Sequence, residues 1–203
     1  MLFDFYFIHN YKTSGTTIFN QLDNEYKKRY YGLMTFNDYI NKNKDININT
    51  KYLRTLNIPP EQRISIDHIL LDNLIHLNII PKNKIQNMKF MMIVREPIER
   101  FISICNFENI EPQKLLNELK NNNRNYFQHT FMVNKHNIKV KTIKMNNKTS
   151  IINFFKQFNI NLDLNVKLNI SEKKYTINDL SKNDISFLKK FYRKDYFLYN
   201  HSE

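Results

Sequence analysis

Two almost continuous apolar runs constrain the fold of this chain more than any other feature. They are Leu2 to Ile8 (LFDFYFI) and Met88 to Val94 (MKFMMIV), and both are rich in β-branched, aromatic or long apolar side chains. A strand with one face in water alternates apolar and polar residues, whereas a strand covered on both faces does not. Both runs are therefore predicted to be strands buried between two layers.

The rest of the chain alternates between segments typical of strands and segments typical of helices. This alternation predicts an α/β fold with a parallel sheet, helices on both faces, and ligands at the carboxyl ends of the strands. Further strands are predicted at 63–67, 139–145 and 166–170, and helices at 16–29, 33–40, 69–80, from Pro97, and at 111–121, 124–133, 150–158 and 176–199.

Length and composition favour one folded domain. The chain has 203 residues, 41% of them hydrophobic, which is enough for a single sizeable core. We expect one domain over 1–203, with the polar, irregular residues 31–60 forming a surface excursion on the acceptor side of a site. The single cysteine, Cys105, falls in an apolar helical stripe and is predicted to be a buried structural thiol.

The charge of the chain excludes only some classes of binding partner. The net charge of +12 and pI of about 9.6 attract phosphates, nucleic acid, acidic glycans or anionic membranes. Lysines are spread along the chain rather than clustered with aromatic residues, so nucleic acid is not the favoured partner. No run approaches the ~20 apolar residues of a spanning helix, and no basic segment precedes the first strand. We expect a soluble protein, cytoplasmic by default.

The loop after the first strand has the features of an anion cradle. Residues 9–17 (HNYKTSGTT) lie between the predicted strand and helix, where the first N–H groups of a helix lack intrahelical partners. Lys12 adds a positive charge, Thr16 and Thr17 add hydroxyl donors, and Gly15 allows close approach of backbone to a phosphate. The loop is not a standard P-loop, because its lysine precedes the glycine. The alternative is a strand-to-helix turn that binds nothing.

A second candidate anion grip follows the run that ends at Val94. Arg95 lies at the strand end, and Ser103 lies on the next helix three residues after Arg100, so the two helix residues share a face. Guanidinium binds phosphate in a two-pronged, charge-assisted way. The alternative is a salt bridge from Arg95 to a neighbouring glutamate. Two grips on one sheet edge imply a ligand with two separated anionic groups.

Both grips resemble motifs of the carbohydrate sulfotransferases. Residues 9–17 resemble the H-x-P-K-T-G-G-T loop that binds the 5′-phosphosulfate in that family, and residues 93–103 (IVREPIERFIS) resemble its R-D-P-x-x-R-x-x-S motif for the 3′-phosphate. Three weaker similarities make the resemblance span nearly the whole chain: NYFQHTF at 125–131 with its central Gln128, LNIS at 168–171, and DYFLY at 195–199.

The resemblance implies a P-loop-like three-layer fold and 3′-phosphoadenosine 5′-phosphosulfate as sulfuryl donor. It implies that Lys12 neutralises charge at the bridging oxygen and that Arg95 and Ser103 hold the 3′-phosphate. The remaining cofactor-binding residues that it implies, around the 5′-phosphate, are Thr13, Ser14, Gly15, Thr16 and Thr17. The chain departs from the pattern at three positions, with Tyr11 for the proline, Ser14 for the first glycine and Glu96 for the aspartate.

Among the six histidines, His68 is the candidate general base. It lies between a predicted strand and a predicted helix, and the family members that sulfate the 2-hydroxyl of uronic acids have a histidine in a similar place. Histidine suits proton transfer near neutral pH. The alternative is a capping or core histidine. His9 is expected to support the phosphate loop, and His76, His129 and His136 to lie on the surface or in loops.

These observations predict a sulfotransferase that acts on a hydroxyl of a carbohydrate or similar acceptor, which could be anionic. Two other functions stay open: a nucleotide-dependent phosphotransferase with a variant phosphate loop, and a basic module that binds polyanions. No metal site is expected, because the sequence has no H-E-x-x-H motif and no cysteine pair.

Overall fold

The computed structural model describes residues 3–49, 63–121, 127–132, 135–166 and 172–203. Its centre is a three-stranded parallel sheet in the order β1 (Phe5–Ile8), β4 (Lys89–Val94) and β5 (Val140–Lys144). The two apolar runs are neighbours, with Phe7 opposite Met91. The side chains of β4 from Phe90 to Val94 are apolar on both faces and buried, as suits a central strand, whereas β5 alternates and forms an edge.

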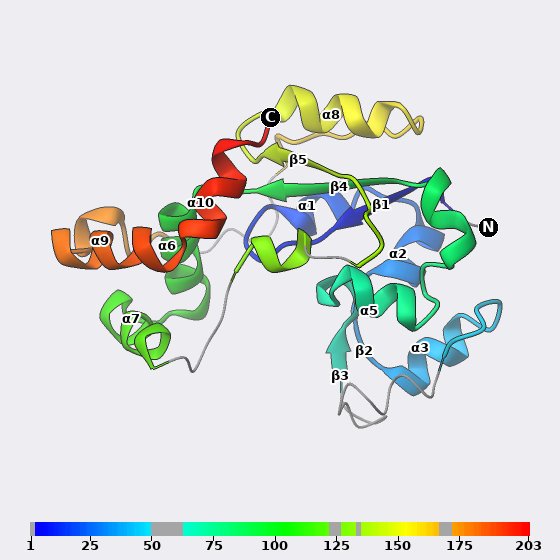
Figure 1. The fold of residues 1–203 in the computed structure, drawn as a ribbon, viewed down its shortest axis with the longest axis horizontal. Coiled ribbons are helices and arrows are strands. Elements are labelled where there is room, and N and C mark those ends of the chain that lie inside the picture. Colours follow the sequence, from blue (N-terminus) through cyan, green and yellow to red (C-terminus); the bar gives the residue numbers. More distant parts are fainter. Residues whose placement is uncertain (1–2, 50–62, 122–126, 133–134, 167–171) are drawn as a thin grey trace.

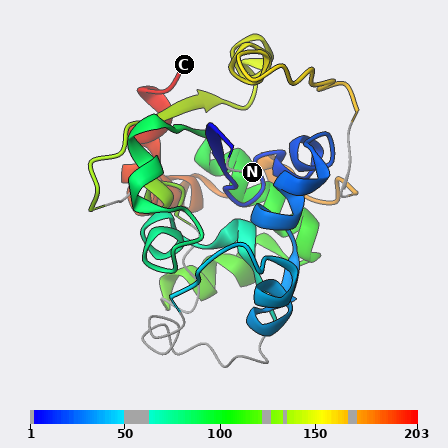
Figure 2. The same cartoon turned by 90° about the vertical axis from the view of Figure 1, so that its right-hand side faces the viewer.

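Helices cover both faces of this sheet. Figures 1 and 2 place α8 (Lys148–Lys156) on one side and α5 (Leu71–His76) on the other. Successive side chains of a strand point to opposite faces. Accordingly the rings of Phe5 and Phe7 pack against Phe155 of α8, with centroids 5.6 and 6.0 Å apart. The prediction of an α/β protein with a helix-flanked parallel sheet is confirmed.

The strand predicted at 63–67 does not join the parallel sheet, so that part of the prediction is wrong. β3 (Arg63–Ser65) is short and pairs antiparallel with β2 (Leu33–Thr35) in a separate ladder. A 3-10 helix, η1 (Ile66–His68), follows it at once. The helix predicted at 33–40 begins later, as α3 (Phe36–Lys42), because the Thr35 hydroxyl caps it by accepting the N–H of Asp38 at 3.1 Å.

The helix predicted at 16–29 is two helices, α1 (Gly15–Phe19) and α2 (Asn24–Tyr30). The carboxylate of Asp23 accepts the N–H of Glu25 at 2.7 Å and starts α2. Asp offers the backbone a local hydrogen bond that competes with helix continuation. The apolar spacing that looked continuous therefore belongs to two helices that both pack on β1.

A second group of helices lies beyond the carboxyl end of β4 (Figure 1). It contains α6 (Pro97–Glu108), α7 (Pro112–Lys120), α9 (Lys182–Phe191) and α10 (Arg193–Asn200) around a core of its own. Cys105 is fully buried in this core, and burial raises the pKa of its thiol to about 12, as expected of a structural thiol. The helix predicted at 176–199 is interrupted. A 3-10 turn, η4 (Ile177–Asp179), precedes α9, and Ser181 caps α9.

Several predicted segments lie partly or wholly outside the described residues. The predicted strand at 166–170 is one, and of the helix predicted at 124–133 the described part holds a 3-10 turn, η3 (His129–Met132). Within the expected excursion at 31–60, residues 31–49 are described, and Phe36 and Tyr39 there are fully buried. One further 3-10 segment, η2 (Lys82–Asn87), precedes β4. Within the described ranges, no helix has the length and apolar character needed to cross a membrane.

Candidate functional site

The carboxyl ends of β1 and β4 open into one cavity of about 570 Å³. Parallel strands bring their carboxyl ends to the same edge of a sheet, which is why two loops distant in sequence meet there. The cavity is lined by every site residue that the sequence singled out: Lys12, Thr13, Ser14, Gly15, Thr16, Thr17, His68, Arg95 and Ser103.

The loop at 9–17 holds two residues in the left-handed backbone region. Lys12 has φ of 61° and Ser14 has φ of 65°, a conformation that costs an L-residue about 1–2 kcal/mol. Ser14 stands where the resembling motif has glycine, so the loop keeps a glycine-like conformation with a hydroxymethyl side chain. The Thr13 hydroxyl donates to the carbonyl of Asn10 at 2.7 Å and closes the turn.

Gly15 is required by the imidazole of His9. A Cβ on Gly15 would lie 1.9 Å from Cδ2 of His9, far inside van der Waals contact. The His9 ring is buried and lies 5.4 Å from the ring of Phe19 and 4.4 Å from that of His68. The sequence suggested that Gly15 lets backbone approach a phosphate, and the structure adds that Gly15 makes room for His9. The buried ring of His9 therefore supports the loop by packing against Gly15.

Replacing Gly15 by alanine is expected to lower the free energy of unfolding by about 1–3 kcal/mol, the usual cost of overpacking. The added methyl group must displace the His9 ring and with it the loop. Urea denaturation followed by circular dichroism measures the effect. Ser14→Gly is the matched control. It removes the strain of a positive φ at the neighbouring position and should leave the free energy of unfolding unchanged or higher. Wild-type stability of Gly15→Ala would contradict this account of Gly15.

The helix that starts at Gly15 is only five residues long. The long helix predicted from the sequence would have offered a sizeable dipole to an anion, and α1 does not. What remains are the N–H groups of its first turn, which have no intrahelical acceptors, and the hydroxyls of Thr16 and Thr17. Any anion bound here depends mainly on these donors and on nearby cationic side chains.

Two cations face this cavity from different strand ends. The pKa of Lys12 is lowered, first by burial and then by the charge of Arg95, while Glu108 acts in the opposite direction. The ammonium of Lys12 lies 3.8 Å from the ring centroid of Phe107. Burial also lowers the pKa of Arg95, against the opposing effect of Glu99. An anion placed between Lys12 and Arg95 would relieve their mutual repulsion and stabilise both charged forms.

Arg95 also forms the ion pair with a neighbouring glutamate that the sequence suggested as the alternative. Its Nε lies 3.7 Å from Oε2 of Glu99. The side chain of Glu99 is 63% exposed, whereas that of Arg95 is 24% exposed. Exposed ion pairs contribute only about 0–1 kcal/mol. Glu99 can therefore turn into solvent at little cost when a stronger anion binds Arg95.

His68 lies at the end of η1, beside the loop. Its Nδ1 is 3.2 Å from the carbonyl oxygen of His9. A carbonyl oxygen only accepts, so Nδ1 carries a hydrogen, and in the neutral ring Nε2 then has the lone pair. Contacts with the rings of His9 and Tyr11, at centroid distances of 4.4 and 5.8 Å, fix its orientation.

Arg100 and Ser103 do not serve one site, contrary to the expectation from their spacing. Ser103 lines the cavity. Arg100 is 1% exposed and is not among the residues that line the cavity. Its Nη2 donates to Asp195 on α10 at 3.1 Å. A residue in the R-x-x-S pattern thus performs a structural role, because α10 covers that side of α6.

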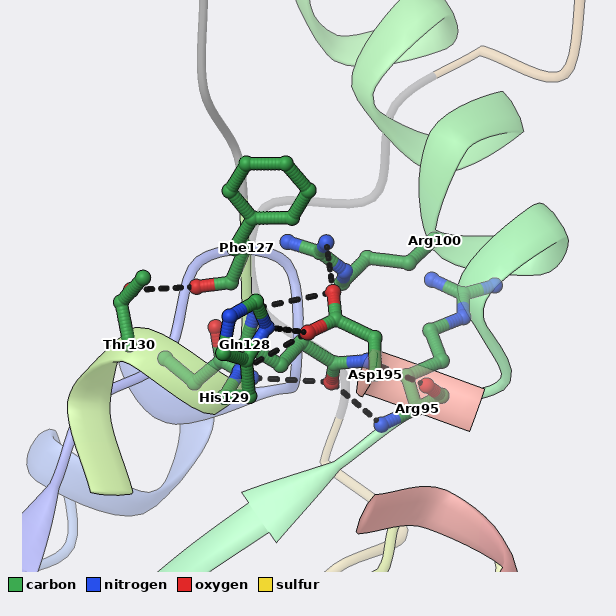
Figure 3. Close-up of polar contacts among 8 residues, drawn as sticks. Arg95, Arg100, Phe127, Gln128, His129, Thr130 and Asp195 are labelled. Atoms are coloured by element: carbon green, nitrogen blue, oxygen red, sulfur yellow. Dashed lines mark hydrogen bonds and ion pairs between the residues drawn. The ribbon is translucent and has the colours of Figure 1, made fainter. Parts of the chain in front are cut away.

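Sequence reasoning missed the polar network behind the cavity, drawn in Figure 3. The side-chain amide of Gln128 contacts both Asn10, after β1, and the backbone of Arg95, after β4. Asp195 accepts hydrogen bonds from the N–H of Gln128 at 2.9 Å, from Arg100, and from the backbone N–H and Nδ1 of His129 at 2.8 and 2.7 Å. Gln128 and Asp195 were visible only as members of two weakly similar segments.

Apolar side chains also line the cavity, among them Met145, Ile151 and Leu164. Lys148, Lys173 and Tyr175 line it as well. Tyr175 is held by a reciprocal pair with Asn106: its N–H donates to Oδ1 at 2.7 Å, and Nδ2 donates to its carbonyl at 2.9 Å. The cavity therefore combines cationic and apolar lining residues, which suits a ligand that carries both phosphates and a ring system.

Among the residues that the structure describes, no group of three or more His, Cys, Asp or Glu side chains is placed to hold a metal ion. Comparison with protein-family models, with characterised proteins and with solved structures gives no match. The geometry of the cavity and the two motifs are therefore the observations that bear on the function of this protein.

Proposed function

We propose that this protein is a sulfotransferase that moves a sulfuryl group from 3′-phosphoadenosine 5′-phosphosulfate to a hydroxyl group of a carbohydrate. The observation that carries the proposal is that the loop at 12–17, Arg95, Ser103 and His68 line the same cavity. A P-loop-like arrangement of the sheet belongs to the proposal. Its support is that the phosphate-binding loop follows β1 and the second grip follows the adjacent strand β4.

The residues of the cavity fit the two phosphates of this donor. The N–H groups and hydroxyls at Gly15, Thr16 and Thr17 would hold the 5′-phosphate, with Lys12 compensating the charge at its bridging oxygen. Arg95 and Ser103 would hold the 3′-phosphate. The pair of cations with lowered pKa supports this assignment, because a doubly anionic ligand compensates both. When bound, the donor supplies an activated sulfuryl group.

His68 is the proposed general base. Because Nδ1 donates to the His9 carbonyl, Nε2 is the ring atom that would take the proton of an acceptor hydroxyl. The reaction then needs positioning and charge stabilisation from the protein rather than covalent chemistry. Because the His68 ring lies 4.4 Å from the ring of His9, which packs against Gly15 of the loop, the proposed base lies next to the proposed donor site.

The proposed acceptor is a glycan, with an anionic one favoured. Tyr11 and Phe107 lie side by side along the cavity, with ring centroids 6.0 Å apart, and Phe107 is 49% exposed. Exposed aromatic rings suit the apolar faces of sugars. Lys148 and Lys173 also line the cavity and would attract carboxylate or sulfate groups on the chain.

Thermal-shift and calorimetric titration with adenosine 3′,5′-bisphosphate, beside 5′-AMP and ATP, tests the donor site. We expect the bisphosphate to raise the melting temperature most, because it alone engages both grips. Arg95→Ala is expected to weaken bisphosphate binding about 10- to 100-fold, since charge-assisted hydrogen bonds contribute about 1.5–3 kcal/mol. Arg193→Ala, an exposed arginine on α10, is the control and should bind as wild type does.

The two rival functions predict different results in the same titration. Preferential stabilisation by ATP with magnesium would favour a phosphotransferase. Salt-dependent binding of oligonucleotides or polyanions without bisphosphate binding would favour a basic binding module. Equal stabilisation by the bisphosphate and 5′-AMP would contradict the sulfotransferase proposal.

A further inference from the structure

One amide side chain joins the two strand ends that carry the phosphate grips. Nε2 of Gln128 donates to the carbonyl of Arg95 at 2.8 Å, and Oε1 accepts the N–H of Arg95 at 2.9 Å. The same Oε1 accepts Nδ2 of Asn10 at 2.9 Å. Arg95, labelled in Figure 3, directly follows β4. Asn10 lies two positions before Lys12.

The contact with Arg95 reproduces the pairing of a neighbouring strand. Both the N–H and the C=O of Arg95 bond to the one side chain, so the backbone stays fixed beyond the last residue of β4. Only an amide offers a donor and an acceptor in this arrangement. Gln128 is fully buried, so water does not compete with these hydrogen bonds.

Gln128 is itself held in place by Asp195. Its backbone N–H donates to Oδ2 of Asp195 at 2.9 Å, and Oδ2 also accepts Arg100 from α6. Oδ1 accepts both the backbone N–H and the Nδ1 of His129. Asp195 is fully buried and bonded through both oxygens, so the amide is anchored to two helices of the second helical group.

We propose that Gln128 is a positioning residue that sets the separation of the two phosphate grips, and thereby the preference for a ligand with phosphates at both the 3′ and 5′ positions. This proposal rests on the sulfotransferase function proposed above. Each grip taken alone binds one phosphate whatever its distance to the other. Only a ligand that spans both grips depends on the distance between Asn10 and Arg95, which the Gln128 amide bridges.

The test is the ratio of dissociation constants for 5′-AMP and adenosine 3′,5′-bisphosphate in Gln128→Met. This change keeps the length of the side chain and removes its donor and acceptor. We expect the bisphosphate preference to fall about tenfold or more, because small displacements of binding groups weaken a two-point contact strongly. The affinity for 5′-AMP, measured well below the melting temperature, should change little.

Thr130→Val is the matched control for general loosening of this segment. The Thr130 hydroxyl donates to the carbonyl of Phe127 at 2.7 Å, within its own segment rather than to either strand end. It should keep the wild-type ratio. If Gln128→Met does not fold, Asn10→Ser tests the same bridge from β1 and should lower the ratio likewise. An unchanged ratio in a folded variant of Gln128 or Asn10 overturns the proposal.

The wild-type titration separates this proposal from the one on which it rests. A wild-type protein without bisphosphate preference overturns both the sulfotransferase function and the role of Gln128. A wild-type preference that survives in Gln128→Met overturns the role of Gln128 alone. A preference that falls equally in Gln128→Met and Thr130→Val would show that loosening of the segment is the cause, and that also overturns the assignment.

Discussion

Replacing Asp195 by alanine is expected to lower the free energy of unfolding by about 3–5 kcal/mol, which is the cost of leaving a buried charge without its partner. Arg100 is 1% exposed, and its pKa is lowered chiefly by burial while the charge of Asp195 opposes that effect. Arginine stays protonated near neutral pH, so the variant keeps a buried cation. The N–H groups of Gln128 and His129 lose their acceptor at the same time.

Urea unfolding of three variants isolates this effect. Asp163→Ala is the control. The exposed carboxylate of Asp163 accepts the N–H of Asn165 at 2.9 Å, the variant keeps the backbone bonds of Asp163 to Gln21, and loss of the carboxylate should cost under about 1 kcal/mol. A double variant, Asp195→Leu with Arg100→Leu, should be more stable than Asp195→Ala, because an apolar pair can replace a buried ion pair. A loss below about 1 kcal/mol in Asp195→Ala would contradict the importance of the buried pair.

Replacing His68 by glutamine is expected to lower kcat by about 10²- to 10⁴-fold, the usual contribution of a general base. Glutamine can still donate to the His9 carbonyl, so the loop should keep its shape, but it cannot take a proton. The affinity for adenosine 3′,5′-bisphosphate should therefore stay near that of wild type. A lower kcat with unchanged affinity for the bisphosphate distinguishes a general base from a residue that merely supports the loop.

The measurement is the rate at which 3′-phosphoadenosine 5′-phosphosulfate is converted to the bisphosphate in the presence of a panel of anionic polysaccharides. His201→Gln is the matched control, because His201 is exposed and its Nδ1 lies 2.8 Å from the carbonyl oxygen of Phe197, one turn earlier on its own helix. It should retain wild-type turnover. Retained turnover in His68→Gln would remove His68 as the base and leave it with the alternative role, a histidine that supports the loop.

The sequence by itself determined the two buried strands, their place in a parallel sheet and the edge at which the candidate residues meet. These features follow from local patterns. Apolar runs identify strands covered on both faces, and parallel strands then bring the residues after each strand to one edge. Lys12 and Arg95 consequently line one cavity although more than eighty positions separate them.

Only the tertiary structure decided the break between α1 and α2, the separate ladder of β2 and β3, and the hydrogen-bonding partners of Gln128. The Asp23 side chain caps α2 and so favours a new helix start over continuation of α1. The free energy of such a cap is small, and the spacing of apolar residues carries no information about it. Gln128 reaches Asn10 and Asp195 across 118 and 67 positions of sequence. The sequence around a glutamine or an aspartate does not show which distant residue it will bond to. These hydrogen bonds form because the groups are buried together, and they are buried only in the folded chain.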